Sequence, residues 1–271
     1  MTQVLIILFV IVIQFFPFVR QWLPQRDEDW LFYITSRQQN IVKLIHDTLN
    51  KFLPYYVNLS KKGQQRFMKR VLFLILKKTV VGYHDFKINH EVAIVIFAAQ
   101  VQLTFGMRKF SMPFIKKILV YPDIFYSRYL EHNVEGLTSG LGYVNISWKH
   151  GVQGYSDPND NKNLLLHEFA HALMIQLARQ EDNDYRIQYN IQKYGSKAIE
   201  IFEKLKKDGN GSHSYLRDYG LNNKHEFFAV SVEHFFESPE RFKNELPELF
   251  DLLCKMLNQN SLNSRLDYAI K

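Results

Sequence analysis

Two histidines and a glutamate stand close together in this 271-residue chain, at a spacing that suits a metal site. Residues four apart on a helix project from the same face, so His167 and His171 can offer two imidazole nitrogens to one ion. Glu168 lies between them, where it can take a proton from water on that ion. The pattern predicts a zinc-dependent peptidase with Glu168 as general base.

The residues around His167, Glu168 and His171 argue against the interpretation that the two histidines are ordinary surface or core histidines. Leucines precede them at 164–166, and Phe169, Ala170, Ala172 and Leu173 surround or follow them, so the polar side chains are embedded in an apolar helix. Unpaired polar groups are costly in such a place. A bound metal ion would remove that cost.

A catalytic zinc usually takes three protein ligands and leaves a fourth position to water, so a further ligand is needed. The metzincin continuation requires Gly at position 174 and His at 177, but Met174 and Leu177 stand there, which excludes that subclass. A second helical segment, 223–236, offers Glu226 and Glu233, whose seven-residue spacing can place both on one face. Other possible ligands crowd the same region of the chain. They are His213, His225 and His234.

The two segments together resemble the Mlc titration factor A family of zinc peptidases, whose downstream helix reads N-x-x-E-F-F-A-V-x-x-E-x-F-F. All nine fixed positions of that pattern are met here. They are Asn223, Glu226, Phe227, Phe228, Ala229, Val230, Glu233, Phe235 and Phe236. The likeness covers nearly the whole chain after about residue 50. It includes Leu53-Pro54-Tyr55, Leu103-Thr104-Phe105-Gly106, Val120-Tyr121-Pro122, Ser147-Trp148, and Asp160 with Asn163.

The resemblance implies a gluzincin-type site similar to that of the anthrax lethal factor catalytic domain, with one Zn2+ per chain. Glu226 would be the third ligand, and Tyr219, seven residues earlier, would donate to the oxyanion of the reaction. Glu233 would orient a metal-bound imidazole by a hydrogen bond, although direct ligation and a purely structural carboxylate stay open. Whether the peptidase is an aminopeptidase also stays open. The family takes its name from sequestering a transcriptional repressor, so capture of such a protein is the alternative function.

The apolar periodicity predicts an α+β chain dominated by helices, a zincin-like metallopeptidase domain with a small sheet. Helices are expected at 29–52, 59–78, 90–103, 161–179, 189–207, 224–237 and 239–256, and strands at 117–121 and 142–148. The strand at 143–148 precedes the metal helix. It is therefore a candidate edge onto which an extended peptide substrate could add by backbone pairing.

An apolar run at 4–19, extended by Trp22 and Leu23, is long enough for a membrane span. It lacks the basic start and small-residue end of a cleaved signal, so we expect residues 1–26 to form an uncleaved anchor and residues 27–271 to form the peptidase domain. Arg20 and Arg26 follow the run and no basic residue precedes it, which places the catalytic domain in the cytoplasm. The alternatives are a signal peptide and a helix buried in a soluble cytoplasmic protein.

The formal net charge of +7 comes largely from one stretch, 61–78, which holds seven basic residues and no acid. They are Lys61, Lys62, Arg66, Lys69, Arg70, Lys77 and Lys78. A solvated helix face over a buried one explains the stretch, and a surface that meets acidic lipid headgroups is the alternative. No nucleic-acid-binding motif accompanies it, so we expect no nucleic-acid partner.

Overall fold

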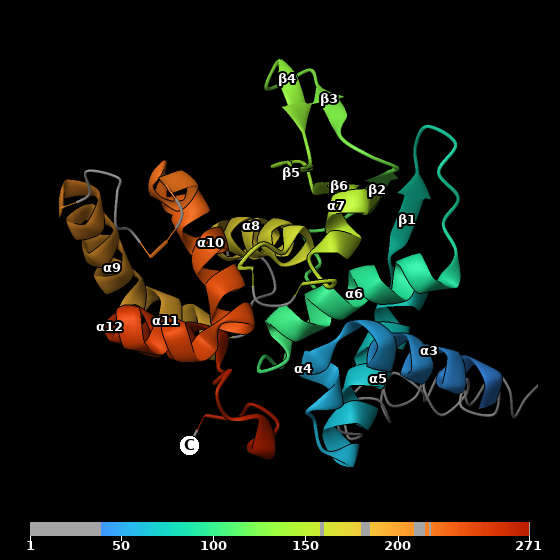
Figure 1. The fold of residues 1–271 in the computed structure, drawn as a ribbon, viewed down its shortest axis with the longest axis horizontal. Helices are drawn as coiled ribbons and strands as arrows, with labels where there is room; N and C mark the ends of the chain where they lie inside the picture. Colours follow the sequence, from blue (N-terminus) through green and yellow to red (C-terminus); the bar gives the residue numbers. More distant parts are fainter. Residues whose placement is uncertain (1–38, 158–159, 180–184, 209–214, 217, 271) are drawn as a thin grey trace, which may run out of the picture.

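The computed structural model of the chain describes residues 39–157, 160–179, 185–208, 215–216 and 218–270 (Figure 1). Its α-helices are α3 (Gln39–Phe52), α4 (Pro54–Val57), α5 (Lys61–Lys77), α6 (His90–Thr104), α7 (Trp148–Gln153), α8 (Leu164–Arg179), α9 (Tyr185–Asp208), α10 (Lys224–Glu237), α11 (Pro239–Glu245) and α12 (Pro247–Leu257). Two 3-10 helices, η1 (Asp218–Leu221) and η2 (Ser264–Leu266), complete the helical part.

The strands form one small mixed sheet and a separate hairpin. The sheet has the order β1 (Thr79–Gly82), β2 (Lys117–Tyr121), β6 (Tyr143–Ser147), β5 (Gly136–Thr138). Strands β1, β2 and β6 are parallel, whereas β5 runs antiparallel to β6. The hairpin of β3 (Phe125–Ser127) and β4 (His132–Val134) projects away from the helices in Figure 1. The predicted α+β class, mostly helical with a small sheet, is confirmed.

Helix α6 lies at the centre of the helical part, with α3 and α5 on one side and α8 on the other. It begins where Asn89 Oδ1 accepts a hydrogen bond from the Val92 amide. Its residues from Ile94 to Thr104 are all buried, because neighbours cover it from both sides. On the far side of this core, α8 packs against strands β5 and β6 and against α10. The core therefore holds α8, the helix of the predicted zinc motif, against a sheet edge and a second helix.

Two of the expectations about the elements were wrong. Strand β6 is not an edge, because it pairs with β2 on one side and with β5 on the other. The expected helix at 239–256 is two helices, α11 and α12, which meet at Leu246. Pro247 begins α12, and the residue before a proline is pushed out of the helical region; Leu246 has φ −135° and ψ 63°.

The predicted membrane anchor at 1–26 lies outside the described residues, as does the first part of the helix expected at 29–52. Within the described ranges, none of the helices has both the length and the apolar character needed to cross a bilayer. The anchor therefore stays a prediction.

The basic stretch on α5 is only partly a solvated face. Arg70 is 3% exposed, and its guanidinium donates to the carbonyl oxygens of Thr104, Phe105 and Met107. These carbonyls stand at and just beyond the end of α6, where helices leave acceptors unsatisfied. Arg66, which is exposed, donates to the Phe105 carbonyl as well. Part of the charge excess thus fastens α5 to the end of the central helix.

We expect Arg70→Lys to lower the free energy of unfolding by about 2 to 4 kcal/mol. An ammonium group cannot reproduce the planar set of donors of the guanidinium, so buried carbonyl oxygens would be left without hydrogen bonds. Arg66→Lys makes the same chemical change on the same helix at an exposed position, and it should cost less than about 1 kcal/mol. Urea unfolding of both variants measures the difference. Equal losses of unfolding free energy in the two variants would show that the buried hydrogen bonds of Arg70 stabilise the protein no more than the exposed one of Arg66.

Candidate metal centre

Two asparagine caps set the position of the candidate ligands on their helices. Asn163 immediately precedes α8, and its Oδ1 accepts a hydrogen bond from the Leu166 amide in the first turn. His167 follows directly and lies in the same turn. Asn223 Oδ1 accepts from the amides of His225 and Glu226 at the start of α10. Glutamate at this third helical position often reaches back to cap its own helix, but the Glu226 carboxylate instead turns toward α8. Both helices therefore present their first turns to the same point.

Ligand atoms of three side chains from these helices come together in a small group, which we call the triangle. His167 Nε2 lies 3.0 Å from His171 Nε2 and 3.1 Å from Glu226 Oε2, and His171 Nε2 lies 3.4 Å from Glu226 Oε1. Among the described residues, this is the one group of three or more histidine, cysteine or acidic side chains whose ligand atoms come together in this way. The geometry selects Glu226 from the two glutamates of the segment as the partner of both histidines.

This triangle fits a zinc ion. Tetrahedral coordination with bonds of 2.0 to 2.1 Å places ligand atoms roughly 3.3 Å apart, close to the distances in the triangle. Glu226 Oε2 is buried and accepts no hydrogen bond, although the Nε2 atom of His167 lies 3.1 Å away. An acceptor left without a donor beside two imidazole nitrogens is what a cation between the three groups would satisfy.

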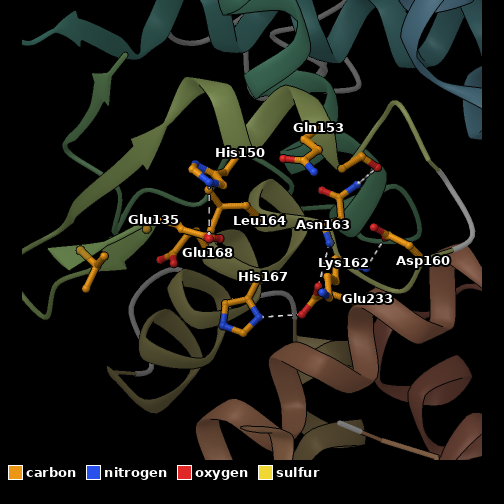
Figure 2. Close-up of a pocket in the computed structure, with 13 residues that line it drawn as sticks. Glu135, His150, Gln153, Asp160, Lys162, Asn163, Leu164, His167, Glu168 and Glu233 are labelled. Atoms are coloured by element: carbon orange, nitrogen blue, oxygen red, sulfur yellow. Dashed lines mark hydrogen bonds and ion pairs between the residues drawn. The ribbon is translucent and has the colours of Figure 1, made fainter. Parts of the chain in front are cut away.

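Glu233 holds His167 from the other side. The His167 Nδ1 atom lies 2.8 Å from Glu233 Oε1, so the imidazole donates there and keeps its Nε2 lone pair for the triangle. The second oxygen of Glu233 accepts from the Asn163 amide at 2.7 Å, and the side chain is 3% exposed. Glu233 is not a member of the triangle. Figure 2 shows its contact with His167, through which it orients a candidate ligand.

The carboxylates around the two imidazoles favour positive charge at the triangle. Burial of His167 disfavours its imidazolium form, but the carboxylates of Glu226 and Glu233 outweigh that cost and raise its pKa to about 10. Burial also opposes ionisation of Glu226, yet the imidazoles of His167 and His171 beside its carboxylate hold its pKa far below the ordinary value. Two carboxylates beside the imidazoles are thus suited to a divalent cation in place of a proton.

The Glu168 side chain lies against strand β5. It is 4% exposed, and its Oε2 accepts from the Thr138 hydroxyl at 2.7 Å. Burial raises its pKa, while the nearby His167 and His171 oppose that shift. A Cβ atom at position 136 would overlap with Glu168 Oε1, so Gly136 leaves the space in which this carboxylate lies. A carboxyl group in a fixed position, with its pKa raised by burial, is suited to accept and return a proton.

A cavity of about 550 Å³ opens beside these groups (Figure 2). It lies between strand β5, the end of α7 and the start of α8. His150 lies on its wall, where its Nδ1 forms a hydrogen bond of 2.8 Å with the Ser147 hydroxyl. Its Nε2 lies 3.5 Å from the Glu135 carboxylate. His167 and Glu168 both line the cavity, so a bound molecule would reach the histidine and the acid together.

The remaining histidines of the region do not join the triangle where the structure describes them. His225 is exposed, and His234 is buried against the rings of Tyr215 and Phe242. His213 lies outside the described residues. Tyr219 lies in η1, which contacts α10, but its side chain is also outside the described part. Its predicted role stays a prediction.

Thr138, Gly136 and His150 are site residues that the sequence did not single out. The first two belong to a strand of three residues, too short for an alternating pattern to appear. The signal that could have found them is the pair of glycines Gly136 and Gly140 around a short apolar and hydroxyl stretch shortly before the strand at 143–147.

Comparison with known proteins gives both a family and relatives. An uncharacterized protein of Synechocystis is 27% identical over 224 residues, which cover 75% of this chain and 79% of the relative. Proteins named Mlc titration factor A from Yersinia pestis and Yersinia pseudotuberculosis are each 22% identical over 267 residues, covering 86% of this chain and 90% of the relative.

The family model described as glucose-regulated metallo-peptidase M90 matches residues 22–257, which include both helices of the triangle. A metallopeptidase family agrees with a chain that brings two imidazoles and a carboxylate within ligand distance of one another. This chain therefore belongs to the glucose-regulated metallo-peptidase M90 family.

Proposed function

We propose that this protein is a zinc-dependent peptidase in which His167, His171 and Glu226 hold the ion. The observation that carries the proposal is the triangle of ligand atoms 3.0 to 3.4 Å apart, with Glu168 next to it in the wall of a cavity. Tyr219 completes the proposed catalytic set through its place seven residues before Glu226.

The protein's own groups divide the work of hydrolysis. A bound zinc ion lowers the pKa of water to about 7 and polarises the scissile carbonyl. Glu168 takes the proton from the attacking water and returns it to the leaving amine, and its raised pKa suits both steps. The Thr138 hydroxyl keeps one Glu168 oxygen in place during these transfers. Tyr219 donates a hydrogen bond to the developing oxyanion.

The edge strand β5 replaces β6 as the proposed partner of an extended substrate. Among the described strands, β5 pairs with β6 alone. Its residue Gly136 lies against Glu168, and Val134 and Glu135 before it line the same cavity. A peptide added to this edge would pass beside the candidate general base. This placement supports cleavage of a peptide bond in the part of the substrate that pairs with β5. It does not indicate which substrate side chains are preferred.

The second candidate function is capture of a protein partner. The name of the Yersinia relatives refers to titration of Mlc, which supports a repressor protein as the partner sequestered by this chain. In that case peptide hydrolysis would be secondary or vestigial. The two functions differ in their need for Glu168, because capture requires a surface and hydrolysis requires the proton transfer.

We expect Glu168→Gln to lower kcat/KM for peptide hydrolysis by about 100-fold or more, because an amide cannot accept the water proton. The variant should retain one zinc per chain, since Glu168 is outside the triangle. Hydrolysis of a mixed peptide library, with and without chelator, measures the loss. Unchanged hydrolysis would refute Glu168 as the base, and a fully retained cellular role without hydrolysis would favour capture of a partner.

We expect Gly136→Ala to reduce kcat by roughly 10- to 100-fold, because the added methyl group displaces the Glu168 carboxylate from its position. Zinc content should stay unchanged. Gly140→Ala is the matched control: it makes the same substitution four residues later, where the added atom would meet only the Arg179 side chain at 3.9 Å. Steady-state kinetics, metal analysis and thermal unfolding of both variants test this. Equal activity of the two variants would contradict the proposed position of Glu168.

A further inference from the structure

A second cavity, of about 220 Å³, lies behind the start of α8. Its walls come from the start of α4, the last turn of α6, the end of α10, the start of α11 and the segment that includes η2. Asn163 and Gly154 line both this cavity and the one beside the candidate metal centre. The two hollows therefore share a wall at the cap of α8.

Side chains on this cavity carry buried oxygen atoms without hydrogen-bond donors. Glu237 is 8% exposed, and neither of its carboxylate oxygens has a partner. The same holds for Gln102 Oε1, whose residue is 5% exposed, and for the Tyr155 and Ser261 hydroxyl oxygens. Buried polar atoms are rarely left without partners in native proteins. A donor or a cation bound in the cavity would satisfy these five atoms.

Acidic side chains line the cavity, and no basic side chain is found among its described lining residues. Its lining includes two glutamates, Glu237 and Glu240, and no lysine, arginine or histidine among the residues described there. Burial raises the pKa of Glu237 to about 8, and the nearby Glu233 and Asp160 carboxylates add to that shift, although Asn163 opposes it. The Asn163 side chain and the Lys162 backbone amide favour the charged form of Glu237, but burial outweighs both of them.

We propose that this cavity binds a monovalent cation beside the Glu237 carboxylate. Carboxylate, amide and hydroxyl oxygens are the ligands of hard cations, and the set contains no sulfur or imidazole nitrogen. A single buried carboxylate with neutral oxygens balances one positive charge. The same chemistry suits an inorganic ion such as K+ or Na+ and a primary ammonium group.

Such a cation would stabilise the helix that holds the candidate metal centre. Glu237 follows Glu233 by one helical turn on α10, and Glu233 hydrogen-bonds His167. The Asn163 amide donates to Glu233, while the Asn163 side chain donates to Gly154 in the shared wall. A positive charge beside Glu237 offsets its repulsion with Glu233. The cation therefore supports the carboxylate that orients His167 without touching the triangle.

Thermal unfolding of the zinc-loaded full chain in different chloride salts tests the proposal. At constant ionic strength, replacing tetramethylammonium, which is too bulky for close contact with oxygens, by K+, Na+ or methylammonium should raise Tm. Above the dissociation constant the rise should be roughly 2 to 3 °C per tenfold increase in cation concentration. A response to K+ or Na+ names an inorganic ion, and a response to methylammonium alone names an ammonium ligand. Equal Tm values in all salts would overturn the proposal.

Two variants and one direct observation make the test specific. Glu237→Gln should abolish the salt-specific rise, whereas Glu240→Gln, at an exposed position of the same cavity, should retain it. If Glu237→Gln does not fold, anomalous scattering from wild-type crystals soaked in rubidium chloride decides. A rubidium peak within bonding distance of the Glu237 carboxylate supports the site. A cavity that holds only water in those crystals refutes an inorganic-ion site, and the methylammonium series then decides alone.

Discussion

The hydrogen bond between His167 Nδ1 and Glu233 Oε1 joins the two helices on which the candidate centre depends. It fixes the imidazole so that Nε2 faces His171 and Glu226, and it occurs in a setting with little access to water. The backbone amide of Asn163 holds the other oxygen of Glu233, so the cap of α8 and the middle of α10 are tied together. Removal of this carboxylate would free the ring to rotate and leave the Asn163 amide without its acceptor.

The same packing gives the two carboxylates next to the histidines different chemistry. Glu226 faces both imidazoles, which favour its ionised form, whereas Glu168 is buried against β5 with one hydroxyl donor. The two environments shift the pKa values of these acids in opposite directions, so one suits a metal ligand and the other a group that carries a proton. The difference depends on the close approach of β5, which the missing side chain of Gly136 permits.

Much of the candidate site was predictable because its main residues follow helical spacing. The four-residue step from His167 to His171 and the seven-residue step from Glu226 to Glu233 each place side chains on one face, and both segments form helices. Which glutamate meets the histidines was not decided by spacing alone, because it depends on how α10 packs against α8. The resemblance to a known family supplied that choice, and the geometry agrees with it.

The sheet was less predictable, for a physical reason. Strands β1, β3, β4 and β5 have only three or four residues each, and their pairing is decided by contacts with distant segments instead of by local pattern. The interpretation of β6 as an edge failed because β5 covers its free side. The roles of Thr138 and Gly136 follow from that pairing, since it brings both residues to Glu168 although they lie 30 or more residues away in the sequence.

The central claim is that one zinc ion is held by two imidazoles and one carboxylate. X-ray absorption at the zinc edge of the purified full chain tests it most directly. The account predicts one zinc per chain with two histidine nitrogens and light oxygen ligands at about 2.0 to 2.2 Å, and the loss of a carboxylate ligand in Glu226→Ala. A chain that binds no stoichiometric zinc, or a zinc with three imidazole ligands or an unchanged spectrum in Glu226→Ala, would contradict it.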